Sequence, residues 1–474
     1  MRRILSGLLA LLSCLALTAS ALGEAAFIPG IAQWELNSIP LELTVTAEVT
    51  AYAPFGEERL PQLTSLMKHL ALRVTRQPLM DETQSTVSIL VDGEEALGLG
   101  LQQTGQRTMA QFSALPDVTF AGADPLAALL GASAEPVTIL GLDGSEDSWV
   151  TDGYELLNAF ETVLSPYLTS EGKVKTEIKN MGTARLKQDY TVSKADAPGL
   201  TELLTSACPE GKLKALVSQL VFSGKQTMRI YRDADGAILR MEWNGQCGLD
   251  EDHLRDVKLT WKLRRDDTAY RDEISLTSPA LKGTDRNTLT WTCSLVPDKA
   301  GLPVLTCSLD YSRTADKQKT VWSGSCKLTA ESNGGDTRVT GEASLSRQLP
   351  DESNATTYTF SPDLTFSGDA NMPSIDGILT VASVNSKKKV LSEAALTVSL
   401  RRAEYTAWQM RQSTVELDQL DEAALETYHQ TVSRAISAAL IRRLAVLPRE
   451  DLDYLFKDLP EESVQAIINA AQSH

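Results

Sequence analysis

The sequence predicts an α+β protein: a large, curved antiparallel β-meander (a half-barrel) covered by helices and followed by a C-terminal helical extension. Three observations predict it. Between residues 173 and 403, apolar and polar residues alternate in segment after segment, as in strands with one buried face. These segments follow one another at hairpin spacing, and so many sequential strands must curl. Helical patterns occupy parts of residues 22–172 and most of residues 404–474.

The N-terminal residues predict export. Two arginines follow Met1, an apolar run covers residues 8–17, and the small residues Ala19, Ser20 and Ala21 come next. This order describes a secretory signal peptide over residues 1–21, and no later stretch reaches the roughly 20 apolar residues of a spanning helix. We therefore expect a secreted or extracytoplasmic protein, in the periplasm or at the cell surface, without a transmembrane segment after cleavage. Lipidation of Cys14 is an alternative left open.

Composition narrows the class of partner. The 474 residues are 42% hydrophobic, which is enough for a substantial core, and the formal net charge is −17. An acidic chain of this kind is not expected to bind nucleic acid, nor to be drawn electrostatically to anionic lipid.

The N-terminal region, residues 22–172, mixes strands and helices and contributes to the half-barrel. Asp92–Gly93 predicts a two-residue hairpin turn, and Asp124–Pro125 predicts the start of a short helix. Strands are expected at 41–52, 86–91, 97–102 and 108–112, and helices around 63–70, 125–130 and 154–167. A loop is expected over 132–147.

The meander, residues 173–403, begins with a strand at 181–192 and a helix around 198–207. Some ten strands then follow in hairpin succession. Asp235–Gly236 predicts a type I′ turn, and residues 264–267 predict the next turn. The expected cross-strand pairs are Ile230 with Met241, Met228 with Trp243, Leu263 with Tyr270, and Leu259 with Ile274.

Three neighbouring strands within the meander carry one cysteine each: Cys293, Cys307 and Cys326. The alternation places Cys307 opposite both others, because a slip of one residue would turn a whole strand inside out. Five cysteines follow the signal peptide, an odd number that cannot all pair. The row is expected to hold buried thiols, with one disulfide as an alternative and a metal site as the least favoured one, because no His, Asp or Glu shares it.

The face that carries the cysteines also gathers aromatic side chains. The candidate ligand-binding residues are Met241, Trp243, Trp261, Trp291, Trp322 and Tyr311. Asp272 lies on the same face, and the predicted register sets it opposite Trp261, near an open rim in contact with water. The alternative for Asp272 is an acid or base of raised pKa. The sequence contains no catalytic signature motif, so we expect no catalytic residue, metal or cofactor, and no enzyme.

The C-terminal residues predict helices at 421–447, at 452–457 and from Pro460 onward. Short helices gain most of their stability from tertiary packing, so they are expected to cover the concave face of the sheet.

This plan, with helices over the apolar face of an incomplete antiparallel barrel between Leu41 and Ala403, resembles the LolA-like half-barrels and the related mycobacterial lipid-carrying lipoproteins. The resemblance lies in architecture alone, and it implies an apolar space that holds acyl chains. The chain is about twice as long as those proteins, and its C-terminal helices lie outside their plan.

Two functions follow from these observations. The first is a non-catalytic structural or interaction module of the bacterial cell envelope, whose aromatic face is filled by the protein's own side chains and helices. The alternative is a carrier or sensor of lipids or other amphiphiles that bind to this face. The expected partners are an apolar ligand or an envelope protein.

Overall fold

The computed structural model forms two compact units. The first unit comprises Gly144–Ser361 and Ser383–Lys389, and the second comprises Gln33–Asp143, Pro362–Ala382 and Val390–His474. The predicted boundaries after 172 and 403 do not separate these units, because the C-terminal helices group with the N-terminal strands. The structure describes residues 39–52, 60–78, 83–104, 107–130, 153–208, 212–250, 253–266, 269–281, 284–315, 318–350, 355–369, 371–404, 413–455 and 465.

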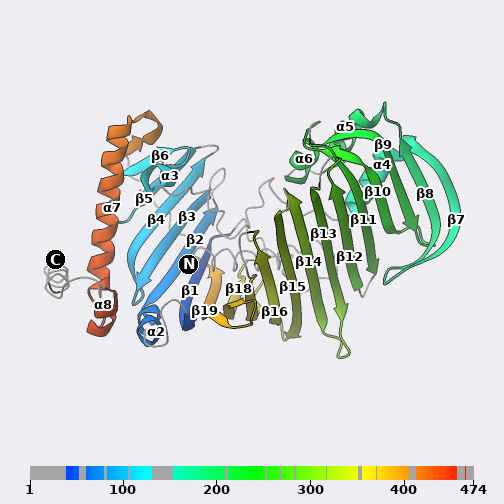
Figure 1. Cartoon of the computed structure of the whole chain (residues 1–474). Coiled ribbons are helices and arrows are strands. Elements are labelled where there is room, and N and C mark those ends of the chain that lie inside the picture. Colours follow the sequence, from blue (N-terminus) through cyan, green and yellow to red (C-terminus); the bar gives the residue numbers. More distant parts are fainter. Residues whose placement is uncertain are drawn as a thin grey trace. The chain divides into compact units, whose positions relative to one another are not determined.

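The first unit is built on ten strands in which each pairs antiparallel with the next along the chain (Figure 1). The strands are β7 (Leu168–Ile178), β8 (Gly182–Val192), β9 (Val221–Arg232), β10 (Ile238–Gly248), β11 (Arg255–Asp266), β12 (Ala269–Pro279), β13 (Arg286–Pro297), β14 (Pro303–Ala315), β15 (Gln318–Asn333) and β16 (Asp336–Gln348). The predicted large antiparallel meander is confirmed, whereas helices are a minor component of the fold. Two further strands, β17 (Thr356–Ser367) and β18 (Ser374–Asn385), contribute residues to both units.

The predicted register of the cysteine row is confirmed. Cys307 on β14 is the direct partner of Cys293 on β13 and of Cys326 on β15. The pairs Trp291 with Leu309 and Tyr311 with Trp322 also form as expected.

The β9–β10 hairpin reaches its predicted register by a different route. Ile230 pairs with Met241 and Met228 with Trp243, but the type I′ turn prediction is wrong. Only Gly236 has a positive φ in this loop, and the Asp233 amide donates to the Ala237 carbonyl around a three-residue loop. A bulge between residues 238 and 240 then restores the register that a two-residue turn would have set.

The β11–β12 register differs from the prediction by two residues. Leu263 pairs with Asp272 instead of Tyr270, and Leu259 pairs with Leu276 instead of Ile274. The strands continue to Asp266 and Ala269, so the turn comes one residue later than expected. Because side chains alternate with period two, this slip leaves every side chain on its predicted face.

The helices of the first unit pack near one end of its sheet, around β8 and β9. They are α4 (Gly153–Leu164), η4 (Ser165–Tyr167), η5 (Ala197–Gly199), α5 (Leu200–Ala207) and α6 (Lys212–Val217). The carboxylate of Glu161 on α4 pairs with the guanidinium of Arg232 on β9 and accepts a hydrogen bond from the hydroxyl of Tyr190 on β8 at 2.7 Å. This contact fixes α4 over the inward face of these two strands.

The second unit has β1 paired antiparallel with both β19 and β2, and the chain of pairs continues through β3, β4, β5 and β6. The last partner, β20, is parallel to β6. The strands are β1 (Leu41–Tyr52), β2 (Leu70–Pro78), β3 (Thr83–Val91), β4 (Glu94–Thr104), β5 (Arg107–Phe112), β6 (Thr119–Gly122), β19 (Val390–Arg402) and β20 (Thr414–Glu416). Asp92 and Gly93 both have positive φ, as the predicted two-residue turn requires. The sequence pattern did not predict β2, β6 and β20.

The helices of the second unit are α2 (Leu60–Lys68), α3 (Pro125–Leu130), η6 (Leu417–Gln419), α7 (Glu422–Leu444) and α8 (Arg449–Leu455). Asp421 caps α7 by accepting a hydrogen bond from the Ala424 amide, and Pro448 separates α7 from α8. Val432 of α7 packs with Phe112 and Phe120, while α8 packs on α2. The core that α7 covers therefore belongs to the N-terminal strands, whereas the prediction put the helices over the concave face of the meander.

Several predictions lie outside the described residues: the signal peptide over 1–21 with Cys14, the loop over 132–147, and the last helix from Pro460. Among the described residues, none of the helices combines the length and the apolar character needed to span a bilayer.

Candidate functional site

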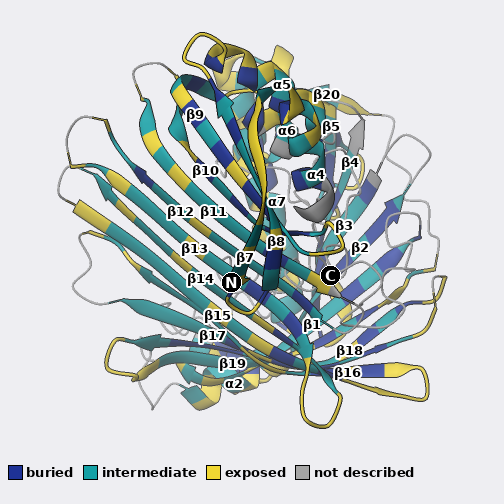
Figure 2. Ribbon diagram, turned by 90° about the vertical axis from the view of Figure 1, so that its right-hand side faces the viewer, coloured by how far each residue is buried: buried dark blue, intermediate teal, exposed yellow. Residues whose placement is uncertain are grey.

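An apolar surface occupies the inward side of β11 to β15 in the first unit, and we call it the aromatic face. All its side chains are half-buried, and β11 to β15 are drawn largely in the teal of intermediate burial in Figure 2. They are Leu259, Trp261, Ile274, Leu276, Leu289, Trp291, Leu309, Tyr311 and Trp322. The pairing register arranges them as two adjacent rows across five strands, a width of about 19 Å at the usual strand spacing.

The aromatic face differs from the buried part of the same sheet. Met241 and Trp243 on β10 are 3% and 9% exposed, and the Trp243 ring packs on Phe222 while its Nε1–H donates to Gln226. These two of the predicted ligand-binding residues therefore form core. The other four lie on the aromatic face. Within the described part of the first unit, the helices make their main contacts with the sheet at β8 and β9.

Asp272 lies in the row next to the aromatic face, with Leu263 on one side and Cys293 on the other. Trp261 Nε1–H donates to its Oδ1 at 2.7 Å, and the Tyr270 hydroxyl lies 3.4 Å from its Oδ2. Burial raises the pKa of Asp272 to about 6, although both hydrogen bonds act to lower it. The expected position opposite Trp261 is wrong, because the register slip sets Asp272 diagonal to that ring, at hydrogen-bonding distance.

Asp272 is expected to make the protein less stable as pH rises from 4 to 6. In this window the unfolded state has lost a proton that the folded state still holds, so stability falls with pH. A pKa near 6 against 3.8 corresponds to a total loss of about 3 kcal/mol. Asp272→Asn should therefore be more stable than the wild type at pH 7 and no more stable at pH 4, in urea unfolding followed by circular dichroism.

Asp189→Asn is the control, because ionisation of Asp189 is expected to stabilise the fold, whereas ionisation of Asp272 destabilises it. Hydrogen bonds from Lys187, Arg229 and Ser170 outweigh burial and lower the pKa of Asp189 to about 2, so that its ionised form stabilises the fold at neutral pH. Parallel stability profiles of Asp272→Asn and wild type between pH 4 and 7 would contradict the assignment of Asp272.

The cysteine row borders the aromatic face on the same side as Asp272. Cys293 is 7% exposed, while Cys307 and Cys326 are half-buried. All three are thiols, and the sulfurs of Cys293 and Cys307 lie 3.0 Å apart.

Arginines lie at the edges of the aromatic face that do not carry the cysteine row. Arg347 lies directly across from Trp322, with its guanidinium carbon 5.8 Å from the centre of that ring. Arg313 follows Tyr311 by two residues and is exposed, and Arg255 shares the parity of Trp261 on β11. We call Arg255, Arg313 and Arg347 the arginine rim. The sequence pattern could have indicated this rim, because the three arginines occupy the same alternating positions as the apolar residues of their strands. Arginine is, however, more often expected on the solvent-facing side of a sheet.

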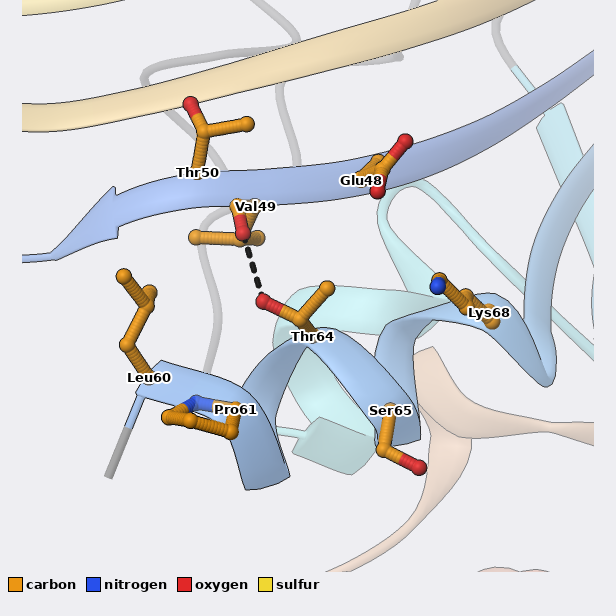
Figure 3. A pocket seen from close by; sticks show the side chains of 8 residues that line it. All are labelled: Glu48, Val49, Thr50, Leu60, Pro61, Thr64, Ser65 and Lys68. Atoms are coloured by element: carbon orange, nitrogen blue, oxygen red, sulfur yellow. Dashed lines mark hydrogen bonds between the residues drawn. The ribbon is translucent and has the colours of Figure 1, made fainter. Parts of the chain in front are cut away.

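Two recesses are lined by residues that do not belong to the aromatic face. The larger, of about 520 Å³, is a groove between β1 and α2 in which Thr64 Oγ1 donates to the Val49 carbonyl at 2.6 Å (Figure 3). The second, of about 280 Å³, lies on the polar side of β8–β10, where Arg229 pairs with both Asp189 and Glu242. Neither encloses the candidate ligand-binding residues, so the aromatic face is a surface rather than the lining of either recess.

His69 in the second unit is half-buried and lies between two carboxylates. Its Nδ1 lies 2.6 Å from Asp92 Oδ1, and its Nε2 lies 3.6 Å from Asp451 Oδ2. Asp451, on α8, also accepts a hydrogen bond from Ser65 Oγ on α2 at 3.3 Å. This cluster joins α8 to α2, which gives it a structural role.

Comparison with known proteins yields similarity to solved structures only. No protein-family model matches the sequence, and no curated protein matches it significantly. The chain is similar to OmpT of Vibrio cholerae, an outer-membrane protein, at 6% identity and a TM-score of 0.26, covering 77% of this chain and 96% of that one. OpdQ of Pseudomonas aeruginosa gives 7% identity and a TM-score of 0.27, covering 78% and 97%.

These similarities are too low to assign a fold family or a function. Of the expected LolA-like plan, the large antiparallel meander is present in the strand pairing of this chain.

Proposed function

We propose that this chain is an exported, non-catalytic binding protein whose aromatic face takes up an amphiphile with an anionic head group. One observation carries the proposal: tryptophan and leucine side chains over five strands stay half-buried, with the unit's described helices packed mainly at β8 and β9. Large contiguous apolar patches are uncommon on soluble proteins, and where they occur they mark interaction or ligand-binding sites. The structural-module alternative requires the protein's own helices to fill this face, whereas the described helices of this unit make their main contacts at β8 and β9, which favours binding.

The arginine rim is the reason for proposing an anionic head group. An apolar tail lying across Trp291 and its neighbours reaches the side bordered by Arg313 and Arg347, where a carboxylate or phosphate finds guanidinium donors. The chain as a whole carries a charge of −17, so a face whose edges carry arginines is a local exception. Long-range attraction to an anionic membrane is not needed, because the tail supplies most of the affinity.

Saturated fatty acids of increasing length, each kept below its micelle concentration, test this proposal. Each methylene buried contributes about 0.8 kcal/mol, so affinity should rise about two- to fourfold per added carbon until the face is covered. Displacement of the uncharged fluorophore N-phenyl-1-naphthylamine measures it. Affinity independent of chain length would refute the amphiphile hypothesis.

The alcohol of equal length tests the head group. It should bind several-fold more weakly than the acid, and Arg313→Gln should narrow that difference while keeping the chain-length trend. Equal affinity for the acid and the alcohol would contradict recognition of an anionic head group, while binding of the apolar tail would still stand.

A further inference from the structure

The cysteine row has a geometry that suits oxidation. Cys293 and Cys307 are directly opposed on antiparallel strands, which is a separation that a disulfide can span, and their sulfurs are already in contact at 3.0 Å. Their neighbours in the row are Leu263 and Asp272 on one side and Cys326 on the other. Asp272, paired with Cys293, is the one carboxylate among these described neighbours, and the described residues contain no cluster of three or more His, Cys, Asp or Glu side chains suited to a metal ion.

The access of the two sulfurs differs. Cys307 is half-buried, whereas Cys293 is 7% exposed. An external disulfide therefore reaches Cys307 first, because exchange requires in-line access to the attacking thiolate. Cys293 sits behind it, placed to complete the exchange.

We propose that Cys293 and Cys307 are a redox-active pair that forms a cross-strand disulfide, and that Cys326 keeps its thiol. The thiolate of Cys307 attacks an external disulfide, forms a mixed disulfide and releases one thiol of the oxidant. The thiolate of Cys293 then attacks the Cys307 sulfur and displaces the second thiol. Two protein thiols are thereby oxidised to one disulfide, and one external disulfide is reduced to two thiols.

Tryptic digestion separates the three cysteines cleanly. Cleavage after the basic residues puts Cys293 in peptide 287–299, Cys307 in 300–313 and Cys326 in 320–327. The full chain is incubated with oxidised glutathione, the remaining thiols are alkylated, and the digest is analysed by mass spectrometry without reduction. The expected product is peptide 287–299 linked to 300–313, with alkylated 320–327.

Three serine variants test the assignment. Cys326→Ser should retain the 287–299 to 300–313 link. Cys307→Ser should abolish every link in the row, because Cys293 and Cys326 are then two strand spacings apart, about 10 Å, beyond the reach of a disulfide. Cys293→Ser should lose the link to peptide 287–299. Circular dichroism of each variant confirms that it folds.

Two results would overturn the proposal. One is the recovery of all three peptides as alkylated thiols after oxidation of the folded wild type. The other is a dominant link between 300–313 and 320–327, which would assign the pair to Cys307 and Cys326 instead. The fatty-acid assays use the reduced protein, so their outcome does not depend on the result of the disulfide mapping.

Discussion

Trp291→Gln is expected to weaken fatty-acid binding at least tenfold. Trp291 sits at the middle strand of the aromatic face, between Ile274 and Leu309, so an acyl chain lying across the face must contact it. The substitution removes a large apolar surface and sets an amide under the chain, where its lost hydrogen bonds to water cost about 1–3 kcal/mol. Displacement of N-phenyl-1-naphthylamine measures the change without an effect of charge.

Thr290→Gln is the matched control. It makes the same replacement one position earlier on the same strand, and because side chains alternate it changes the opposite, exposed face. Its affinity for fatty acids should equal that of the wild type. Equal losses in the two variants would show that Trp291 acts through the stability of β13, and wild-type affinity in Trp291→Gln would exclude the aromatic face as the binding site.

Gly341→Ala is expected to destabilise the first unit by about 3 kcal/mol or more. Gly341 lies on β16 opposite Leu328, with a φ of +146° that L-residues rarely adopt. A Cβ there would lie 2.2 Å from the Lys327 carbonyl oxygen, so the β15–β16 ladder would have to separate. Strained backbone and overpacking each cost about 1–3 kcal/mol. The urea midpoint, followed by far-ultraviolet circular dichroism, should fall by about 1 M.

Gly172→Ala on β7 supplies the comparison, since no atom lies within 4 Å of the Cβ it would add and the position is exposed. Its urea midpoint should stay close to that of the wild type. A Gly341→Ala midpoint within the same range would mean that β16 accommodates the methyl group by a local shift.

Period-two alternation along single strands determines much of the first unit. Cys293, Cys307 and Cys326 each lie in a strand where a slip of one residue would turn the apolar residues to the other face, and the predicted register is the one observed. The same logic could not detect the β11–β12 slip, because a shift of two residues preserves both faces. The hydrogen bond from Trp261 to Asp272 was therefore beyond the reach of the pattern.

The sequence pattern also failed to predict short strands and strands that pair with distant parts of the chain. Residues 70–78 form β2 although Leu70 continues the apolar spacing of the preceding helix, and β20 is three residues long and paired in parallel with a strand almost 300 residues away. Such pairing depends on where the chain returns, which local periodicity does not encode.

The sequence alone determined the antiparallel meander, the row of cysteines and the identity of the aromatic side chains, because these follow from alternation along single strands. Only the tertiary structure decided which of those side chains form core and which stay half-buried. Met241 and Trp243 are buried, and Trp243 packs on Phe222, while Trp291 and Trp322 stay half-buried. Burial depends on contacts between distant segments, and that is why the candidate site could be predicted from the residues but its openness could not.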